Sequence, residues 1–527
     1  MKKVLISDKM SQAGLDYLES RDALEIVYKP GLTRDELLLE VADAEGLIIR
    51  SGTKVTAEVL SAARELKVIG RAGIGVDNID IPAATERGVL VMNTPDANAT
   101  TTAELALAHI LSLSRHLPQA DASIREGRWE RSKYVGAELS GKTLGVIGFG
   151  TIGRIVADRA VGLKMRVIAY DPFVTKEVYD RLGVEGAAFE EVLAASDYVT
   201  LHCPCNEKTR GLIGEAQIAQ MKRGARLINC ARGGLVDEAA LCRALEDRHL
   251  AGAALDVYET EPPGDSPLLA LDNIVFTPHL GASTAEAQVA VSTAIVRQVA
   301  AYLEEGEAVN GVNLPSMSAE ELRRLGPYQL LAQRLGRLLS CLVAGPLNEL
   351  SVTLYGQAAE VDTHPVAVEA LVGLLGERLE GRVNSVNAAH LAALQGVSLV
   401  ESRSEQARDY VSLITLTGRH GDRATTVSGA LLGGRHPRLV EIDDIKVEAI
   451  PEGTMLVTRH DDQPGVIGAL GTLLGGQSVN ISRMQVGLDR KTGRAMAILG
   501  ISDRLSREAL DAVGRIPAVE SVMQVSL

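Results

Sequence analysis

The segment that most constrains the fold is a glycine-rich turn behind an apolar run. Gly148, Gly150 and Gly153 have the spacing G-x-G-x-x-G and directly follow the β-rich residues 143–147. A helical pattern covers 154–162, and the next predicted strand ends at Tyr170 and Asp171. The spacing alone is weak evidence in a chain with 51 glycines. Strand, glycines, helix and acid in this order are typical of a dinucleotide-binding βαβ unit.

The chemistry of such a unit predicts NAD as the cofactor. Glycines let a pyrophosphate approach the backbone, and its charge is stabilised at the helix N-terminus. The Asp171 carboxylate is expected to accept hydrogen bonds from ribose hydroxyls and to repel a 2′-phosphate, which disfavours NADP. The alternative is a tight βα turn that binds no ligand.

Two stretches of the chain alternate strands and helices, which predicts an α/β fold with two parallel sheets covered on both faces. The expected strands are 4–6, 25–28, 46–49, 67–70 and 89–92 in the first stretch, and 143–148, 166–170, 198–202, 225–230, 252–257 and 273–277 in the second. Helical segments at about 100–117 and 283–304 follow the two stretches. We expect the chain to cross twice, so that a Rossmann-type domain (99–285) is inserted in a first domain (1–98 and 286–313).

The carboxyl-terminal 200 residues predict two further domains. Residues 315–450 mix helical patterns at 319–342 and 364–378 with strand-like runs at 350–354 and 410–416, which indicates an α+β domain without a recognisable chemical motif. Residues 454–527 have the order βαββαβ of a ferredoxin-like unit.

Composition excludes several classes of partner. The net charge is −14 and only sixteen residues are aromatic (four Phe, eleven Tyr, one Trp), which disfavours nucleic acid. No apolar run reaches the roughly 18 residues of a membrane span, and the amino terminus does not resemble a signal peptide. Five cysteines make no disulfide framework and predict a reducing, cytoplasmic setting. Cys203-x-Cys205 lacks a second Cys/His pair nearby, so we expect buried thiols and no metal.

Three polar residues follow successive predicted strands of the second sheet: Arg232, Glu261 and His279. Ligands of open α/β sheets bind outside the carboxyl ends of the strands, so the three are expected to share one crevice. Histidine suits the base that takes a hydroxyl proton near neutral pH, and a carboxylate beside it stabilises the imidazolium. A guanidinium can bind a substrate carboxylate with two hydrogen bonds. Taken singly, each residue is more often structural or part of a solvated ion pair.

These motifs resemble the D-isomer-specific 2-hydroxyacid dehydrogenases. The matching stretches are 49–51, 71–78, 148–153, 229–233, 261–262 and 277–284. The resemblance places the catalytic Arg, Glu and His of the family on Arg232, Glu261 and His279. It also implies that the first domain is flavodoxin-like and binds substrate, through Arg50, Ser51, Gly73, Gly75, Arg232 and His279. The implied NAD contacts are Gly148, Gly150, Thr151, Ile152, Gly153, Asp171, Cys203, Ala231, Asp256, Gly281 and Ala282. The family often has Thr at position 203 and an apolar residue at 205, so a Cys203 side-chain contact is in doubt.

Among relatives the chain is most similar to those with a long carboxyl-terminal extension. This likeness implies oxidation of 3-phospho-D-glycerate to 3-phosphooxypyruvate, the first step of L-serine synthesis, by a homotetramer. The alternatives are another D-2-hydroxyacid dehydrogenase, such as a glyoxylate or hydroxypyruvate reductase, and a dinucleotide-sensing interaction protein. Arg131 and Lys133 either lie in a solvated loop or serve the site of a neighbouring subunit.

The same likeness implies that the last domain is an ACT domain that binds L-serine as a feedback inhibitor. The expected effector residues are His460, Asp462 and Asn480, since a carboxylate can accept from an ammonium and an amide can both donate and accept. The alternative is a capped turn without an effector.

Overall fold

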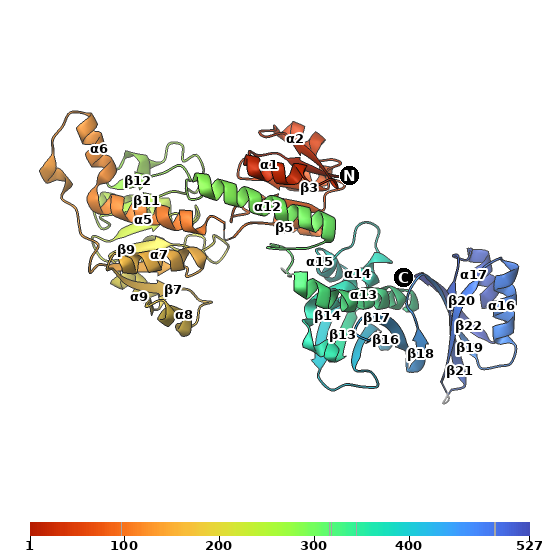
Figure 1. Cartoon of the computed structure of the whole chain (residues 1–527). Coiled ribbons are helices and arrows are strands. Elements are labelled where there is room, and N and C mark those ends of the chain that lie inside the picture. The colour runs from red at the N-terminus through yellow and green to blue at the C-terminus, as the bar shows by residue number, and fades with distance from the viewer. Residues whose placement is uncertain (96, 316, 318, 344, 490–491) are drawn as a thin grey trace.

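The computed structural model describes residues 1–95, 97–315, 317, 319–343, 345–489 and 492–527. These residues form four β-sheets in chain order, each with its own helices (Figure 1). The α/β fold class expected from the sequence is confirmed. None of the helices in the described ranges is both long and apolar enough to cross a membrane.

The first sheet has the strand order β2-β1-β3-β4-β5 with all strands parallel, which is the flavodoxin-like order. Its strands are β1 (Lys2–Ile6), β2 (Leu24–Tyr28), β3 (Gly46–Ile49), β4 (Val68–Arg71) and β5 (Leu90–Met92), and its helices α1 (Gln12–Glu19), α2 (Arg34–Glu40), α3 (Ala57–Ala62) and α4 (Ile81–Glu86). Apolar side chains of the strands alternate between two buried clusters, because helices cover both faces of the sheet.

The second sheet has the order β12-β11-β10-β9-β6-β7-β8, the Rossmann order with one added strand. Its strands are β6 (Thr143–Ile147), β7 (Arg166–Tyr170), β8 (Glu185–Gly186), β9 (Tyr198–Leu201), β10 (Arg226–Asn229), β11 (Gly252–Leu255) and β12 (Ile274–Phe276). The helices are α7 (Thr151–Gly162), α8 (Lys176–Arg181), α9 (Phe189–Ala195), α10 (Glu215–Gln220) and α11 (Glu238–Glu246).

Two long helices join these sheets. Each follows one sheet in the sequence and packs on the other. Helix α5 (Ala99–Arg115) leaves the first sheet and packs on α7 and on β10 to β12. Helix α12 (Ala285–Glu305) leaves the second sheet and returns to β3, β4 and α1. A Cβ atom at Gly70 would lie 2.5 Å from Val299, so this glycine allows α12 to approach the first sheet closely.

The long helical segment expected at about 100–117 is confirmed as α5. Helix α5 ends at Arg115 because His116 adopts a left-handed conformation (φ 51°), and a separate helix α6 (Leu117–Arg125) follows. In Figure 1, α6 and the loop after it extend away from the second sheet.

The third sheet has the order β14-β13-β15-β16-β17-β18, with only β13 and β14 parallel. Its strands are β13 (Glu349–Gly356), β14 (Ser398–Ser404), β15 (Ser412–His420), β16 (Arg423–Leu432), β17 (His436–Ile442) and β18 (Ile445–Ala449), and its helices are α13 (Ala319–Leu342), α14 (Thr363–Gly376) and α15 (Ala388–Leu394). Helices α13 and α14 pack against one another over the sheet.

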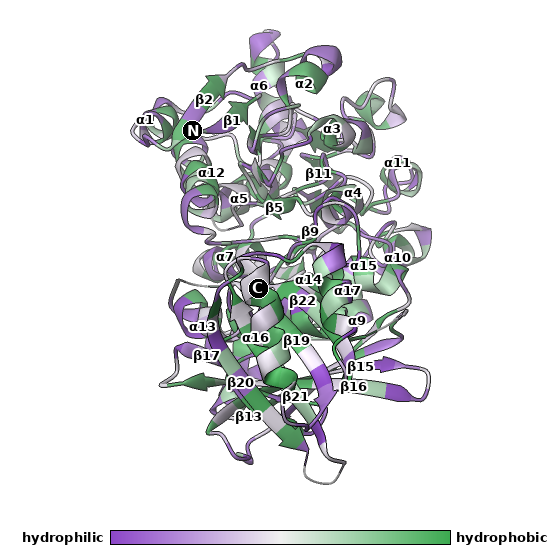
Figure 2. Cartoon of the chain, turned by 90° about the vertical axis from the view of Figure 1, so that its right-hand side faces the viewer, coloured by the Kyte–Doolittle hydropathy of each residue, from purple (hydrophilic) through white to green (hydrophobic). Residues whose placement is uncertain are grey.

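The fourth sheet has the order β20-β21-β19-β22 and confirms the ferredoxin-like unit. Its elements are β19 (Thr454–Asp461), α16 (Val466–Gly476), β20 (Ile481–Asp489), β21 (Arg494–Ile501), α17 (Arg507–Gly514) and β22 (Val519–Ser526). Figure 2 shows α16 in front of these strands, and Leu456 and Leu499 pack beneath the helices. Met455 and Ile498, on the other face, share the core of the third sheet.

Candidate active site

The three glycines of the motif have different structural roles. Gly148 has φ +91°, and a Cβ atom there would lie 2.6 Å from the carbonyl group of His202. At Gly153 a Cβ atom would lie 2.1 Å from the carbonyl oxygen of Gly148. A Cβ atom at Gly150 would have no other atom within 4 Å among the described residues. The first and third glycines therefore form the turn and pack the helix, and the second leaves open space at the N-terminus of α7, where a phosphate can approach.

Asp171 follows β7 and lies beside this turn. Its Oδ2 accepts a hydrogen bond from the backbone N–H of Phe149 (2.8 Å), and its Oδ1 accepts one from the N–H of Phe173 (2.9 Å). These two bonds fix the carboxylate next to the glycine turn, the position expected for a ribose-binding acid.

A cavity of about 510 Å³ lies between the first and second sheets. Its lining includes many of the predicted residues, namely Gly75, Gly150, Thr151, Ile152, Cys203, Ala231, Arg232, Asp256, His279, Gly281 and Ala282. Arg50, Ser51 and Gly73 are not among the lining residues, and neither are Gly148, Gly153, Asp171 and Glu261. The cavity therefore contains two of the three residues of the predicted trio, and Glu261 reaches it through His279.

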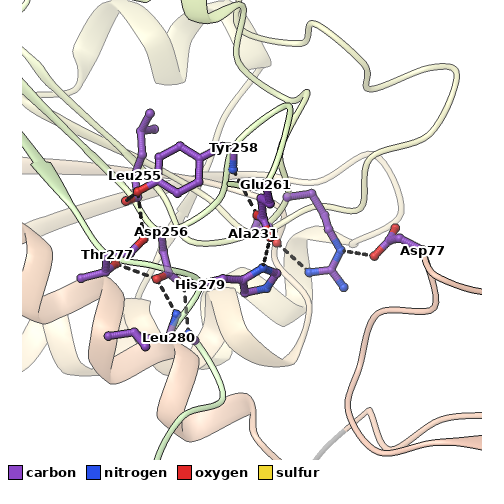
Figure 3. Close-up of polar contacts among 11 residues, drawn as sticks. Asp77, Ala231, Leu255, Asp256, Tyr258, Glu261, Thr277, His279 and Leu280 are labelled. Atoms are coloured by element: carbon purple, nitrogen blue, oxygen red, sulfur yellow. Dashed lines mark hydrogen bonds and ion pairs between the residues drawn. The ribbon is translucent and has the colours of Figure 1, made fainter. Parts of the chain in front are cut away.

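His279 and Glu261 form a hydrogen-bonded pair at this cavity (Figure 3). Nδ1 of His279 lies 2.8 Å from Oε2 of Glu261, and Oε1 of Glu261 accepts from the backbone N–H of Tyr258 (3.2 Å). The carboxylate therefore orients the imidazole, and Nε2 of His279 is left for a ligand. The His279 backbone is in the left-handed region (φ 54°), which is uncommon for a residue other than glycine.

Asp256 holds the turn that carries His279. Its side chain is fully buried (0% exposed). Oδ1 accepts from the hydroxyl of Thr277 (2.6 Å) and the N–H of Leu280 (2.6 Å), and Oδ2 accepts from the N–H of Gly281 (2.9 Å). The family resemblance implied that Asp256 contacts NAD. The structure gives its carboxylate three hydrogen bonds within the protein, so its main contribution is to the shape of the turn.

Arg232 extends from the loop after β10 toward the first sheet. Its Nε lies 2.9 Å from Oδ2 of Asp77, and its Nη1 donates to the carbonyl of Ala231 (2.6 Å). A Cβ atom at Gly75 would lie 2.0 Å from Nη2 of Arg232, so the glycine makes room for the guanidinium. Figure 3 labels Asp77 and Ala231, the two partners of the Arg232 guanidinium.

Arg71, at the end of β4, lines the cavity and was missed by the sequence reasoning. Burial, with a smaller effect of Arg232, lowers the pKa of the Arg71 guanidinium to about 10. Its Nε has no hydrogen-bond partner among the described residues. A buried guanidinium without a full set of acceptors is expected to bind an anion. Its place at the carboxyl end of a predicted strand was the available signal.

Two thiols at the cavity, those of Cys203 and Cys230, are neutral. Burial raises the pKa of Cys203 to about 11 and that of Cys230 well above its usual range. All five cysteines are free. Within the described part of the chain, no group of three or more His, Cys, Asp or Glu residues is placed to hold a metal ion.

The predicted effector residues lie at opposite ends of the fourth sheet. His460 and Asp462 lie at the end of β19, beside the start of β21, whereas Asn480 lies beside the other end of β21. His460 is 2% exposed, and its Nε2 has no partner among the described residues. Asp462 and Asn480 are exposed, and their backbone N–H groups donate to the Gly493 carbonyl (3.1 Å) and to the Ser502 hydroxyl (3.1 Å).

Two family models match the chain. D-isomer specific 2-hydroxyacid dehydrogenase, NAD binding domain, matches residues 107–281, and the D-3-phosphoglycerate dehydrogenase intervening domain matches residues 324–443. The first match confirms NAD as the cofactor class expected from the glycine motif and Asp171.

Curated relatives match over the whole length. D-3-phosphoglycerate dehydrogenases of Methanocaldococcus jannaschii and Archaeoglobus fulgidus are 41% and 42% identical to the chain, with 100% of both partners covered in each comparison. The enzyme of the same name from Bacillus subtilis is 40% identical, again over 100% of both.

A solved structure matches more than half of the chain. D-lactate dehydrogenase from Aquifex aeolicus, complexed with NAD and lactic acid, is 30% identical with a TM-score of 0.54, over 59% of this chain and 100% of that one. The chain therefore belongs to the D-isomer-specific 2-hydroxyacid dehydrogenases, NAD-dependent oxidoreductases, and within them to the D-3-phosphoglycerate dehydrogenases with an intervening domain.

Proposed function

We propose that this chain oxidises 3-phospho-D-glycerate at C2 to 3-phosphooxypyruvate, the first step of L-serine synthesis, with NAD as the acceptor. The observation that carries the proposal is the His279–Glu261 pair facing the same cavity as Arg232 and the open Gly150 turn. The full-length relatives named D-3-phosphoglycerate dehydrogenase support the choice of substrate.

The residues present fit NAD. The open space at Gly150 accommodates the pyrophosphate at the N-terminus of α7, and Asp171 is placed for the ribose hydroxyls. When bound, the nicotinamide accepts the hydride. His279 takes the C2 hydroxyl proton on Nε2, and Glu261 stabilises the imidazolium that forms. Arg232 binds the substrate carboxylate and polarises the reacting oxygen.

Arg71 is the best-placed cation for the substrate phosphate. It lines the cavity, its Nε is unpartnered among the described residues, and it lies close enough to Arg232 for the two charges to interact. Arg50 is a second candidate, since it also interacts with the charge of Arg71. In this structure Nη1 of Arg50 donates to the carbonyl of Lys9 (3.4 Å), and Arg50 is not among the residues that line the cavity.

NADH formation from a panel of D-2-hydroxyacids tests the substrate. The panel comprises 3-phospho-D-glycerate, D-glycerate, D-lactate and glycolate. We expect kcat/KM to be at least about a hundredfold higher for the phosphorylated acid, since charge-assisted hydrogen bonds to a phosphate contribute roughly 1.5–3 kcal/mol each. Equal values would make the enzyme a general hydroxyacid dehydrogenase, and turnover of none would favour a dinucleotide-sensing interaction protein.

A homotetramer is proposed for the assembly. Helix α6 and the following loop expose the apolar side chains Leu117, Ile124, Trp129 and Val135, and exposed apolar clusters of this kind are typical of subunit contacts. Arg131 and Lys133, in the 3-10 helix Arg131–Tyr134 of the same loop, would then serve the site of a neighbouring subunit. Light scattering of the purified protein measures the mass.

Feedback inhibition by L-serine is proposed for the last domain, acting as an ACT domain. The unpartnered Nε2 of buried His460 supports a ligand there, with Asp462 beside it as the group for the ammonium. Asn480 lies at the opposite end of the sheet, so its amide would meet the same ligand only from a second copy of the domain. Its edge strand β20 exposes Met484, Val486 and Leu488, which supports pairing with a second copy. The five free thiols support a reducing compartment, which we propose is the cytoplasm.

A further inference from the structure

Helix α5 holds the turn of His279 through three of its side chains. The Thr101 hydroxyl lies 3.4 Å from that of Thr284, and the Thr102 hydroxyl donates to the carbonyl of Gly281 (2.9 Å). Deeper in the interface, Nε2 of His109 lies 3.0 Å from the hydroxyl oxygen of Thr277. We propose that His109 is a positioning residue for the reaction, acting on His279 through Thr277 and Asp256. This inference rests on the proposed use of His279 as the base.

The hydrogen bonds fix the direction of this chain of contacts. The Thr277 hydroxyl has one proton, and it donates this proton to Oδ1 of Asp256 at 2.6 Å. The hydroxyl oxygen is therefore the acceptor toward His109, and Nε2 of His109 carries the proton. The resulting order is His109 to Thr277 to Asp256, with each group donating to the next.

The last member of the chain shapes the backbone at His279. The Asp256 carboxylate also accepts from the N–H groups of Leu280 and Gly281, and the Asp256 carbonyl accepts from the N–H of His279 at 2.9 Å. His279 has φ 54°, a conformation that costs of order 1 kcal/mol or more for a residue other than glycine. Contacts around the turn must therefore hold it, and a loss of the Thr277 orientation weakens them.

Burying an imidazole at position 109 costs free energy that an apolar side chain of similar size would not, so packing alone does not explain a histidine there. The side chain is 3% exposed, and the apolar residues Ala106, Ile110 and Leu113 of the same helix surround this region of the core. Burial lowers the pKa of His109, with Asp256 opposing the shift, so the ring is neutral at pH 7. A neutral ring with one N–H suits a hydrogen-bond donor to Thr277 and has no use in an apolar core.

Steady-state kinetics of His109→Leu, His109→Gln and Leu113→Ala in the full-length enzyme test the inference. The Leu variant removes the donor and keeps the volume, and the Gln variant offers an amide N–H in a similar place. Leu113→Ala is the matched control. Leu113 is buried one helical turn further along α5, and its apolar side chain forms no hydrogen bond with the loop that carries His279.

We expect H109L to lower kcat at least about tenfold, with the Kd for NADH within twofold of wild type, because a misplaced reacting group costs rate rather than cofactor affinity. H109Q should recover most of the rate. L113A should lower Tm about as much as H109L does and leave kcat unchanged. Equal kcat in H109L and L113A, or no recovery in H109Q, would overturn the positioning role.

An NMR measurement made without substrate tests this inference separately from the proposed function. The imidazole Cε1–H resonance of His279, assigned by its loss in His279→Ala, reports the turn without any substrate. It should shift in H109L and stay unchanged in L113A. An unchanged resonance in H109L overturns the inference, whereas failure of wild type to oxidise 3-phospho-D-glycerate overturns only the proposed substrate.

Discussion

Nδ1 of His279 lies 2.8 Å from Oε2 of Glu261, at the end of the turn between β12 and α12. A second His–Glu pair of the same length exists in the third domain, where Nδ1 of His364 lies 2.8 Å from Oε1 of Glu401. The two pairs differ in surroundings. Only the first borders the cavity that Arg232 and the glycine turn also line, so location and not geometry distinguishes the catalytic pair.

His279→Ala should lower kcat at least about a hundredfold, the lower end of the contribution of a general base, with little change in NADH affinity. His364→Ala is the matched control, because it breaks an equal pair outside the cavity, and its kcat should equal that of wild type. NADH formation at saturating substrate measures both. A His279→Ala enzyme with more than a tenth of the wild-type rate would exclude this residue as the base.

Asp171→Asn should relax the preference for NAD over NADP. The neutral amide no longer repels a 2′-phosphate and offers a donor to it, so the ratio of kcat/KM for NADP to that for NAD should rise about tenfold or more. Asp180→Asn, on the exposed surface of α8, serves as the control. If the cofactor ratio of the Asp171 variant equals that of wild type, Asp171 does not face the ribose.

Arg71→Ala should lower kcat/KM for 3-phospho-D-glycerate about 10- to 100-fold, the loss of one charge-assisted contact with phosphate. Unphosphorylated D-glycerate should lose much less. Arg50→Ala should show a smaller selective loss, because Arg50 is not among the residues that line the cavity. Equal losses for both substrates in the Arg71 variant would assign Arg71 to the carboxylate or to the fold.

His202 should make the stability of the second domain depend on pH. Burial lowers its pKa to about 4 in the folded state, against about 6.5 in the unfolded chain. Below pH 6.5 the unfolded state therefore binds a proton that the folded state does not, and stability falls as pH falls toward 4. The loss at pH 5 is about 2 kcal/mol, from roughly 1.4 kcal/mol per pH unit.

His202→Gln removes this titration and should flatten the decline of Tm between pH 7 and pH 5. His390→Gln, at an exposed histidine of α15, should decline with pH as wild type does. A His202 variant whose Tm declines as steeply as that of wild type would show that another group controls the acid sensitivity.

L-serine should inhibit wild type and not the Asp462→Ala enzyme, since the carboxylate is the proposed partner of the effector ammonium. Asp511→Ala, at an exposed acid on α17 of the same domain, is the control and should keep inhibition. Initial rates over a range of L-serine measure the effect. Inhibition that persists in Asp462→Ala would place the effector site elsewhere.

Sequence reasoning predicted the two parallel sheets well because their strands are buried on both faces and stand out as apolar runs between amphipathic helices. It missed β8, which has two residues, and helix α6, which the left-handed backbone of His116 separates from α5. It also missed much of the third sheet, including β16 to β18. Those strands form through antiparallel pairing, and no motif in their sequence indicates their partners.

At the site, the trio was predictable because each member follows a strand of one sheet. Arg71 and His109 were not identified, because their significance comes from burial and hydrogen bonding, which a single sequence does not display. The role of Asp256 was also incomplete, since its three partners include two backbone N–H groups that any residue at those positions would provide.

The most direct test of the account is the fate of the C2 hydrogen. The enzyme is incubated with NAD and 3-phospho-D-glycerate deuterated at C2, and the NADH is analysed by mass spectrometry and proton NMR. Direct hydride transfer predicts one deuterium on the nicotinamide C4 for each 3-phosphooxypyruvate formed, with no loss to water. Deuterium released to solvent, or product formed without deuterated NADH, would contradict direct hydride transfer at this site.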